Sequence, residues 1–177
     1  VNLLDNLIAS VYKADNGIIW IGNWGKGLNM YDRKTGEVQH FSSQHGGKNY
    51  LPNDFIHVIY KDNKNVIWIG TRDGILVYNL DENSFDRLNK YYNCDRELNL
   101  ENHRIYNIIQ DKNNNYWIAT QHGLHMHNLN TFETKSFFSD TENEQFISSN
   151  LVYNILEDKD GLIWIATSTG LDVYYPD

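Results

Sequence analysis

Cysteine, proline and long apolar runs are all scarce in this sequence, whose 177 residues include 1 Cys and 2 Pro. With Cys94 alone, the chain can form no disulfide within itself and no cysteine-based zinc site, and the cysteine count does not fix its compartment. The longest apolar runs, such as 18–21, have about four residues, whereas about 20 are needed to span a bilayer. We therefore expect no membrane insertion by this segment.

Basic residues are also too few to give the chain a cationic surface. The 15 Lys and Arg stand against 23 Asp and Glu, for a formal net charge of −8. Such a chain has no basic footprint for a phosphate backbone or an anionic membrane, so we expect no nucleic-acid partner. The sequence begins Val1-Asn2-Leu3 without the basic start and apolar run of a secretory signal, so we expect any signal to be removed or to lie outside this chain.

Aromatic residues are abundant instead. They make up 14% of the chain, with 12 Tyr and 5 Trp, and 41% of the residues are hydrophobic. This length and composition suit one globular domain with a sizeable core. Aromatic side chains favour strands and the many Asn and Gly favour turns, so the composition indicates β structure.

One phrase recurs four times along the chain, each copy centred on a tryptophan. The tryptophans are spaced by 48, 49 and 47 residues, and an aspartate, a threonine and a glycine recur at fixed distances from three of them. These positions are Trp20, Trp68, Trp117 and Trp164, then Asp62, Asp111 and Asp158, then Thr71, Thr120 and Thr167, then Gly74, Gly123 and Gly170. Because the tryptophans recur in every copy, we expect them to be core residues, and we expect the aspartates, which recur in three copies, to be structural.

The hydrophobic pattern within one copy predicts strands. In the second copy, the runs 55–61, 66–71, 74–79 and 84–89 are short, β-branched or aromatic, and separated by turn residues. Four antiparallel strands in about 48 residues form the blade of a β-propeller, which buries its faces only against neighbouring blades. The sequence therefore predicts an all-β propeller segment over 1–177, with blades at about 5–42, 54–89, 103–138 and 150–175.

The fourth copy, from Asn150 to Tyr174, includes the phrase Asp-x-x-Gly-x-Ile-Trp-Ile-Ala-Thr-x-x-Gly-Leu-x-x-Tyr. It resembles the two-component regulator propeller repeat, and the four copies extend this resemblance over essentially the whole chain. The resemblance implies the periplasmic sensor region of a hybrid two-component system, in which paired seven-bladed propellers precede a membrane helix and a cytoplasmic histidine kinase. It also implies a response to oligosaccharides released from polysaccharides.

Departures from the repeat raise the question of how the propeller closes. The first copy has Ala14 and Asn23 where others have Asp and Thr, and the last copy stops at Tyr175-Pro176-Asp177, after its third strand. The resemblance implies a fragment of a seven-bladed propeller. Two alternatives are a four-bladed ring completed by Val1 to Leu4, and a homodimer that forms an eight-bladed ring through exposed sheet edges.

Candidate ligand-binding residues lie in loops that share one propeller face. Sugar recognition needs an apolar face for stacking and polar groups for the hydroxyls. Trp24, beside Asn23 and Lys26, matches this chemistry best, although packing on the next blade is the alternative. Further candidates, each also explicable as an ordinary solvated loop residue, are Arg72, His103, Arg104 and His122.

Metal and cofactor sites are not expected. The runs that begin at Asp111 and Asp158 resemble calcium loops, but they lack the bidentate Glu and are better explained as hairpin turns. A zinc trio of His122, His125 and His127 has no carboxylate partner, and His127 stands where other copies have a packing Tyr.

Catalytic motifs for hydrolases, metalloproteases and phosphate-loop enzymes are absent, and Cys94 lies in a polar loop between blades. We therefore expect a non-enzymatic sensor segment that detects oligosaccharides and signals to a kinase elsewhere in a longer protein. One alternative is an interaction or dimerisation scaffold without its own ligand. A second is a propeller lyase or hydrolase.

Overall fold

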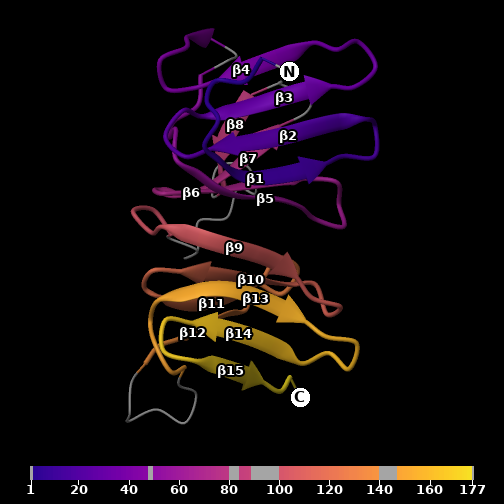
Figure 1. Ribbon diagram of the computed structural model, residues 1–177. Helices are drawn as coiled ribbons and strands as arrows, with labels where there is room; N and C mark the ends of the chain where they lie inside the picture. The colour runs from indigo at the N-terminus through magenta and orange to yellow at the C-terminus, as the bar shows by residue number, and fades with distance from the viewer. Residues whose placement is uncertain (1, 48–49, 80–83, 89–99, 140–146, 177) are drawn as a thin grey trace.

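The computed structural model describes residues 2–47, 50–79, 84–88, 100–139 and 147–176. Its strands form four antiparallel sheets, which we call blades 1 to 4 in chain order (Figure 1). Blade 1 contains β1 (Ile8–Lys13), β2 (Ile18–Asn23), β3 (Leu28–Asp32) and β4 (Val38–Phe41). Blade 2 contains β5 (Ile56–Lys61), β6 (Ile67–Thr71), β7 (Gly74–Asn79) and β8 (Ser84–Arg87). Blade 3 contains β9 (Ile105–Gln110), β10 (Asn115–Thr120), β11 (Gly123–Asn128) and β12 (Thr134–Phe137), and blade 4 contains β13 (Val152–Glu157), β14 (Ile163–Thr167) and β15 (Leu171–Tyr174).

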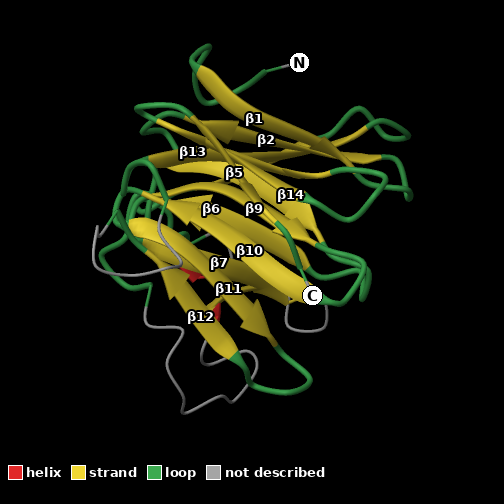
Figure 2. Cartoon of the chain, turned by 90° about the horizontal axis from the view of Figure 1, so that it is seen from below, coloured by secondary structure: helices red, strands yellow, loops and turns green. Residues whose placement is uncertain are grey.

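Each blade is a simple meander in which consecutive strands pair, and the turns gather at the two ends of the strands (Figure 2). The prediction of all-β propeller blades with an incomplete last blade is confirmed, since blade 4 has three strands. Contacts between blades run in chain order, from β1 to β5 to β9 to β13, and Figure 1 shows the two termini at opposite ends of the stack. No helix among the described residues is long and apolar enough to cross a membrane.

Among the described residues, 2–4 do not complete a four-bladed ring. The backbone N–H of Leu4 donates to Asn29 Oδ1 of blade 1, at 3.1 Å. The sheet of blade 4 contains β13, β14 and β15 alone. The initial segment is therefore held on the first blade and supplies no strand to the last.

The recurring aspartates close the hairpin between the first two strands of blades 2 to 4. Asp62 Oδ1 accepts the backbone N–H groups of Lys64 and Val66, at 2.9 and 2.8 Å, and Asp111 accepts the equivalent pair. Asn65 then takes a left-handed conformation, with φ of 66°, as Gly161 does in blade 4 with φ of 86°. These bonds are those of an Asx turn, the hairpin geometry that Asp, Asn and Gly favour.

The core lies between blades, because the tryptophans of blades 1 to 3 each pack on an aromatic ring of the next blade. Trp20 contacts Tyr78 with ring centroids 4.9 Å apart, Trp68 stacks on Tyr116 at 4.4 Å, and Trp117 contacts Tyr174 at 5.1 Å. Accordingly, Trp20, Trp68 and Trp117 are buried, whereas Trp164 is half-buried because blade 4 has no following sheet in this structure. Three of the four expected core tryptophans thus lie in the core.

The second oxygen of the same aspartates fixes these tryptophans. The indole Nε1 of Trp68 donates to Asp62 Oδ2 at 3.0 Å, and the hydroxyl of Tyr116 in blade 3 donates to the same oxygen at 2.9 Å. Trp117 and Trp164 make the equivalent bonds to Asp111 and Asp158, at 2.8 Å each. One carboxylate therefore connects a hairpin turn, a core ring and, in blade 2, the next blade.

Replacing Asp62 with alanine should destabilise the chain markedly, because two buried donors lose their acceptor. At about 1–3 kcal/mol for each of the two buried groups left unsatisfied, Asp62→Ala should lower the free energy of unfolding by about 2–6 kcal/mol. Asp158→Ala is the matched control, since its tryptophan is only half-buried, and it should cost clearly less. Urea unfolding of both variants measures the difference, and equal losses would contradict the account.

Candidate functional site

The innermost strand of every blade carries an irregularity at the same aligned position. The pairing with the second strand skips one residue between Ile8 and Ser10, between Ile56 and Val58, and at the equivalent points of β9 and β13. The skipped residues, each eleven before the repeat tryptophan, are Ala9, His57, Tyr106 and Tyr153. A β-bulge redirects the side chain of its extra residue. Here it places one side chain from each blade at a common pocket.

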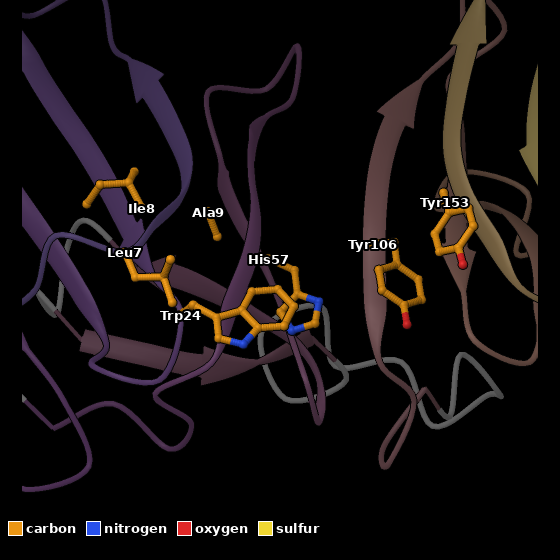
Figure 3. A pocket seen from close by; sticks show the side chains of 7 residues that line it. All are labelled: Leu7, Ile8, Ala9, Trp24, His57, Tyr106 and Tyr153. Carbon is orange, nitrogen blue, oxygen red and sulfur yellow. The ribbon is translucent and has the colours of Figure 1, made fainter.

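That pocket has a volume of about 400 Å³, within the range of small-molecule sites. Blade 1 and the segment before it contribute Leu7, Ile8, Ala9 and Trp24, and blades 2, 3 and 4 contribute one residue each. Figure 3 shows Leu7, Ile8 and Ala9 together at one side and the rings of Trp24, His57, Tyr106 and Tyr153 in succession across the site. The pocket thus belongs to all four blades.

The four rings form a continuous aromatic arc. Trp24 and His57 are stacked, with centroids 4.4 Å apart and planes inclined by 18°. His57 lies 5.6 Å from Tyr106, which in turn lies 5.6 Å from Tyr153 in an edge-on arrangement. Trp24 and Tyr153, at the two ends of the arc, are 44% and 47% exposed. The arc therefore offers ring surface to a ligand at both ends.

Trp24 is held in place by the irregular turn of blade 1. Its backbone N–H donates to Leu7 O at 3.0 Å, and Trp24 forms an isolated β-bridge with Phe55 of the next blade. The N–H groups of Gly25 and Gly27 both donate to Asp54 O, at 3.1 and 2.8 Å. The turn is thus fixed to blade 2, and the indole reaches across to His57.

Asn23, predicted beside Trp24, lies beneath the turn rather than on its surface. It is fully buried, its amide nitrogen donates to Asp5 O at 2.9 Å, and its amide oxygen accepts from Asn29. The corresponding threonine of blade 2, Thr71, instead bonds to Gly74 O within its own turn. Asn23 therefore ties the segment before β1 to the sheet, which brings Leu7 to the pocket.

His57 is buried, and neither of its ring nitrogens has a hydrogen-bond partner within the described chain. Burial is the main cause that lowers the pKa of His57 to about 4, and the positive charges of Arg104 and Arg72 contribute to the same shift. The imidazole is therefore neutral at pH 7, with one donor and one acceptor available to a ligand. Because an unpaired buried polar group is costly, such an arrangement is a common mark of a functional site.

The other predicted loop residues lie outside the pocket lining and form two groups. Arg104, two residues before Tyr106, is half-buried with an unpartnered Nε, and Arg72 is exposed with its guanidinium carbon 5.2 Å from the centre of the Phe55 ring. Lys26 is exposed in the turn that carries Trp24. These three residues lie near the arc or on elements that form it.

His103 and His122 are brought together away from the pocket lining. Their ring centroids are 5.3 Å apart, and His103 lies 5.8 Å from His125. His127 bonds to Thr134 within blade 3, so the three histidines considered for zinc do not form one group. Among the described residues, no three His, Cys, Asp or Glu side chains are placed to hold a metal ion. Cys94 lies outside the described residues.

Sequence reasoning missed His57, Tyr106 and Tyr153. They occupy one aligned position inside the first strand, where simple alternation places a side chain on one face of the blade. The sequence signal that could have identified this position is its variation. The four copies have Ala, His, Tyr and Tyr there, whereas neighbouring positions carry similar residues in every copy.

Comparison with known sequences identifies the repeat. Residues 50–73, 99–122 and 147–169 match the family described as two component regulator propeller, which confirms the predicted resemblance. The unmatched first copy is the one with Ala14 and Asn23. Histidine kinase P4 of Formosa agariphila is 31% identical over 72 residues, which are 39% of this chain and 5% of that protein.

Comparison with solved structures identifies the fold. The extracellular domain of a putative hybrid two component system of B. thetaiotaomicron has a TM-score of 0.76 at 23% identity, over 99% of this chain and 22% of that one. A virginiamycin B lyase from Staphylococcus aureus has a TM-score of 0.63 at 10% identity, over 98% of this chain and 57% of that one. At these identities both likenesses concern the propeller fold alone. The chain spans only a small part of the two-component proteins it matches.

The buried histidines should make the chain less stable in mild acid. Burial lowers the pKa of His57 and of His125 to about 4 and also lowers that of His127, whereas an unfolded histidine has a pKa of about 6.5. As the pH falls from about 6.5 to 4, the unfolded chain binds more protons than the folded chain, so stability decreases. Thermal unfolding should show a drop of at least several degrees across this window.

Two variants identify the groups responsible. His125→Leu introduces the residue that blade 2 has at this position, Leu76, and should make stability less dependent on pH between 6.5 and 4. His45→Gln, at an exposed position, should leave the dependence unchanged. A pH profile that is the same in both variants and in the parent chain would contradict the assignment.

Proposed function

Because this chain carries two-component regulator propeller repeats, we propose that it is an extracytoplasmic ligand-sensing segment of a hybrid two-component protein. Its ligand is an oligosaccharide that binds in the pocket of the aromatic arc, and its signal passes to a histidine kinase outside this segment. The segment is periplasmic and non-enzymatic. Its partners are further blades and signalling domains of the same protein.

The observation that carries this proposal is the aromatic arc itself. Sugars present flat C–H faces that pack on aromatic rings and hydroxyls that need donors and acceptors. Trp24 and Tyr153 provide half-exposed rings, and His57 provides a neutral imidazole with two unpartnered nitrogens. A pocket of about 400 Å³ has room for a short oligosaccharide segment.

The position of the pocket also supports a sensing role. Its lining comes from all four blades, so a ligand that touches Trp24 and Tyr153 spans blade 1 and blade 4. Such a ligand stabilises the arrangement of blades to which it binds best, and it shifts the population by its difference in affinity. A change in blade arrangement is a signal that adjoining domains can receive.

The lining does not suggest hydrolysis. Glycosidases use a pair of carboxylates on either side of the scissile bond. The described residues that line the pocket include His57 and two tyrosines but no Asp or Glu. This supports sensing over a glycoside hydrolase.

A second candidate function, an interaction or dimerisation scaffold, is favoured by the outer face of blade 4. Leu156 and Leu171 are 63% and 62% exposed there, and Trp164 is half-buried. This is the face through which the tryptophans of blades 1 to 3 pack on their neighbours. Further blades or a second copy of the chain could cover it, and a concentration-dependent sedimentation coefficient would indicate the second copy.

Trp24→Ala should weaken oligosaccharide binding at least tenfold, because the ring that is stacked on His57 also forms one end of the arc. The parent chain should melt several degrees higher with a ligand at a hundredfold excess over its Kd, since this excess adds about 2.7 kcal/mol. Calorimetric titration with pools of neutral and acidic oligosaccharides then gives the Kd of each variant.

Phe132→Ala is the control, because Phe132 is 60% exposed in the β11–β12 turn and contributes nothing to the pocket lining. It should bind like the parent chain. Unchanged binding by Trp24→Ala would show that the sugar binds elsewhere, and a cooperative melt that no pool shifts would favour the scaffold.

A further inference from the structure

Cationic groups without ionic partners lie beside the aromatic arc. Arg104 has a buried Nε with no hydrogen-bond acceptor, and Arg72 is placed over the ring of Phe55. In the part of the chain that the structure describes, no carboxylate lies within 4.0 Å of either guanidinium. This is notable in a chain with a net charge of −8.

The described carboxylates of the neighbouring loops, Asp54, Asp73 and Glu101, have other partners. Asp54 accepts bonds from the N–H and the hydroxyl of Ser43, at 2.7 and 2.6 Å. Asp73 accepts the N–H of Asn102 at 2.9 Å, and both Asp73 and Glu101 face Arg87, at 3.9 and 3.6 Å. Arg87 therefore offsets these two acids, while Arg72 and Arg104 have no ion pair with a described carboxylate.

Among the described residues, the charges that act on His57 are positive. Burial is the largest cause of the lowered pKa of His57, and the charges of Arg104 and Arg72 act in the same direction. A quaternary ammonium group, which aromatic rings often bind, is therefore disfavoured here. An anion is favoured, because it gains from both these positive charges and the unpaired donors.

Continuing from the oligosaccharide-binding function proposed above, we propose that the pocket selects acidic oligosaccharides, whose carboxylate or sulfate group binds Arg104 with support from Arg72. A sugar ring of the same ligand packs on Trp24, and His57 bonds to a hydroxyl. Arg104 is the specificity-determining residue, since its Nε is the buried donor that lacks an acceptor.

Matched ligands test this selectivity directly. Tetragalacturonate and its methyl ester share one sugar backbone but differ in charge and in the added methyl groups, and a sulfated galacto-tetrasaccharide can be compared with its desulfated form. The chain should bind at least one acidic member about tenfold more tightly than its neutral counterpart, as measured by calorimetry. The comparison between the two pairs shows whether carboxylate or sulfate is preferred. The advantage should shrink as salt rises, because screening weakens the attraction.

Variants of Arg104 locate the effect. Arg104→Gln should reduce affinity for the acidic ligand about tenfold or more and leave affinity for the neutral ligand unchanged. Arg104→Lys keeps the charge but loses the planar fork, so it should recover part of the affinity. Arg33→Gln is the matched control at an exposed arginine in the β3–β4 turn, at the other end of the strands. Thermal melting confirms that each variant is folded.

The outcomes separate the two proposals. If acidic and neutral ligands bind equally well, or if Arg104→Gln affects both alike, charge selection is overturned and oligosaccharide sensing stands. If none of the four ligands binds the parent chain, both proposals are overturned. Should Arg104→Gln fail to fold, the comparison of matched ligands on the parent chain still decides the matter.

Discussion

Packing of a tryptophan from one blade on an aromatic ring of the next is the interaction on which the rest of this structure depends. An isolated four-stranded sheet has two faces and cannot bury either by itself. In blades 2 and 3, a buried aspartate accepts a hydrogen bond from the indole and closes the adjacent hairpin. The indole is therefore held in a fixed position against the aromatic ring of the next blade. Blade 1 has Ala14 at this position, and its tryptophan is held by packing between Phe41 and Tyr78.

This packing also determines where a ligand can bind. It brings the innermost strands β1, β5, β9 and β13 into succession, and a bulge in each directs one side chain to a shared pocket (Figure 3). The structural and binding positions are therefore separate within each repeat. The repeated residues build the stack, while the varied position at Ala9, His57, Tyr106 and Tyr153 gives the pocket its chemistry. Because each blade contributes one part, the site exists only while the blades are stacked.

Most of the fold could be predicted from the sequence, and only part of the site. Trp20, Trp68 and Trp117 are core residues because their repetition reflects a packing requirement common to all blades. Trp24 was recognisable as an aromatic residue in an irregular turn. The position of Asn23 beneath that turn was not, since it depends on a bond to Asp5, eighteen residues away. His57 and Tyr106 were missed because a bulge, which strict alternation does not anticipate, decides where they point.

The central claim is that the aromatic arc binds a sugar and that the arginines beside it select an acidic one. A crystal structure of the chain with a bound acidic tetrasaccharide tests this most directly. The account predicts a sugar ring packed on Trp24, with its acidic group on Arg104 and a hydroxyl within hydrogen-bond distance of His57. A tetrasaccharide bound on the outer face of blade 4, or anywhere else with the arc empty, would contradict it.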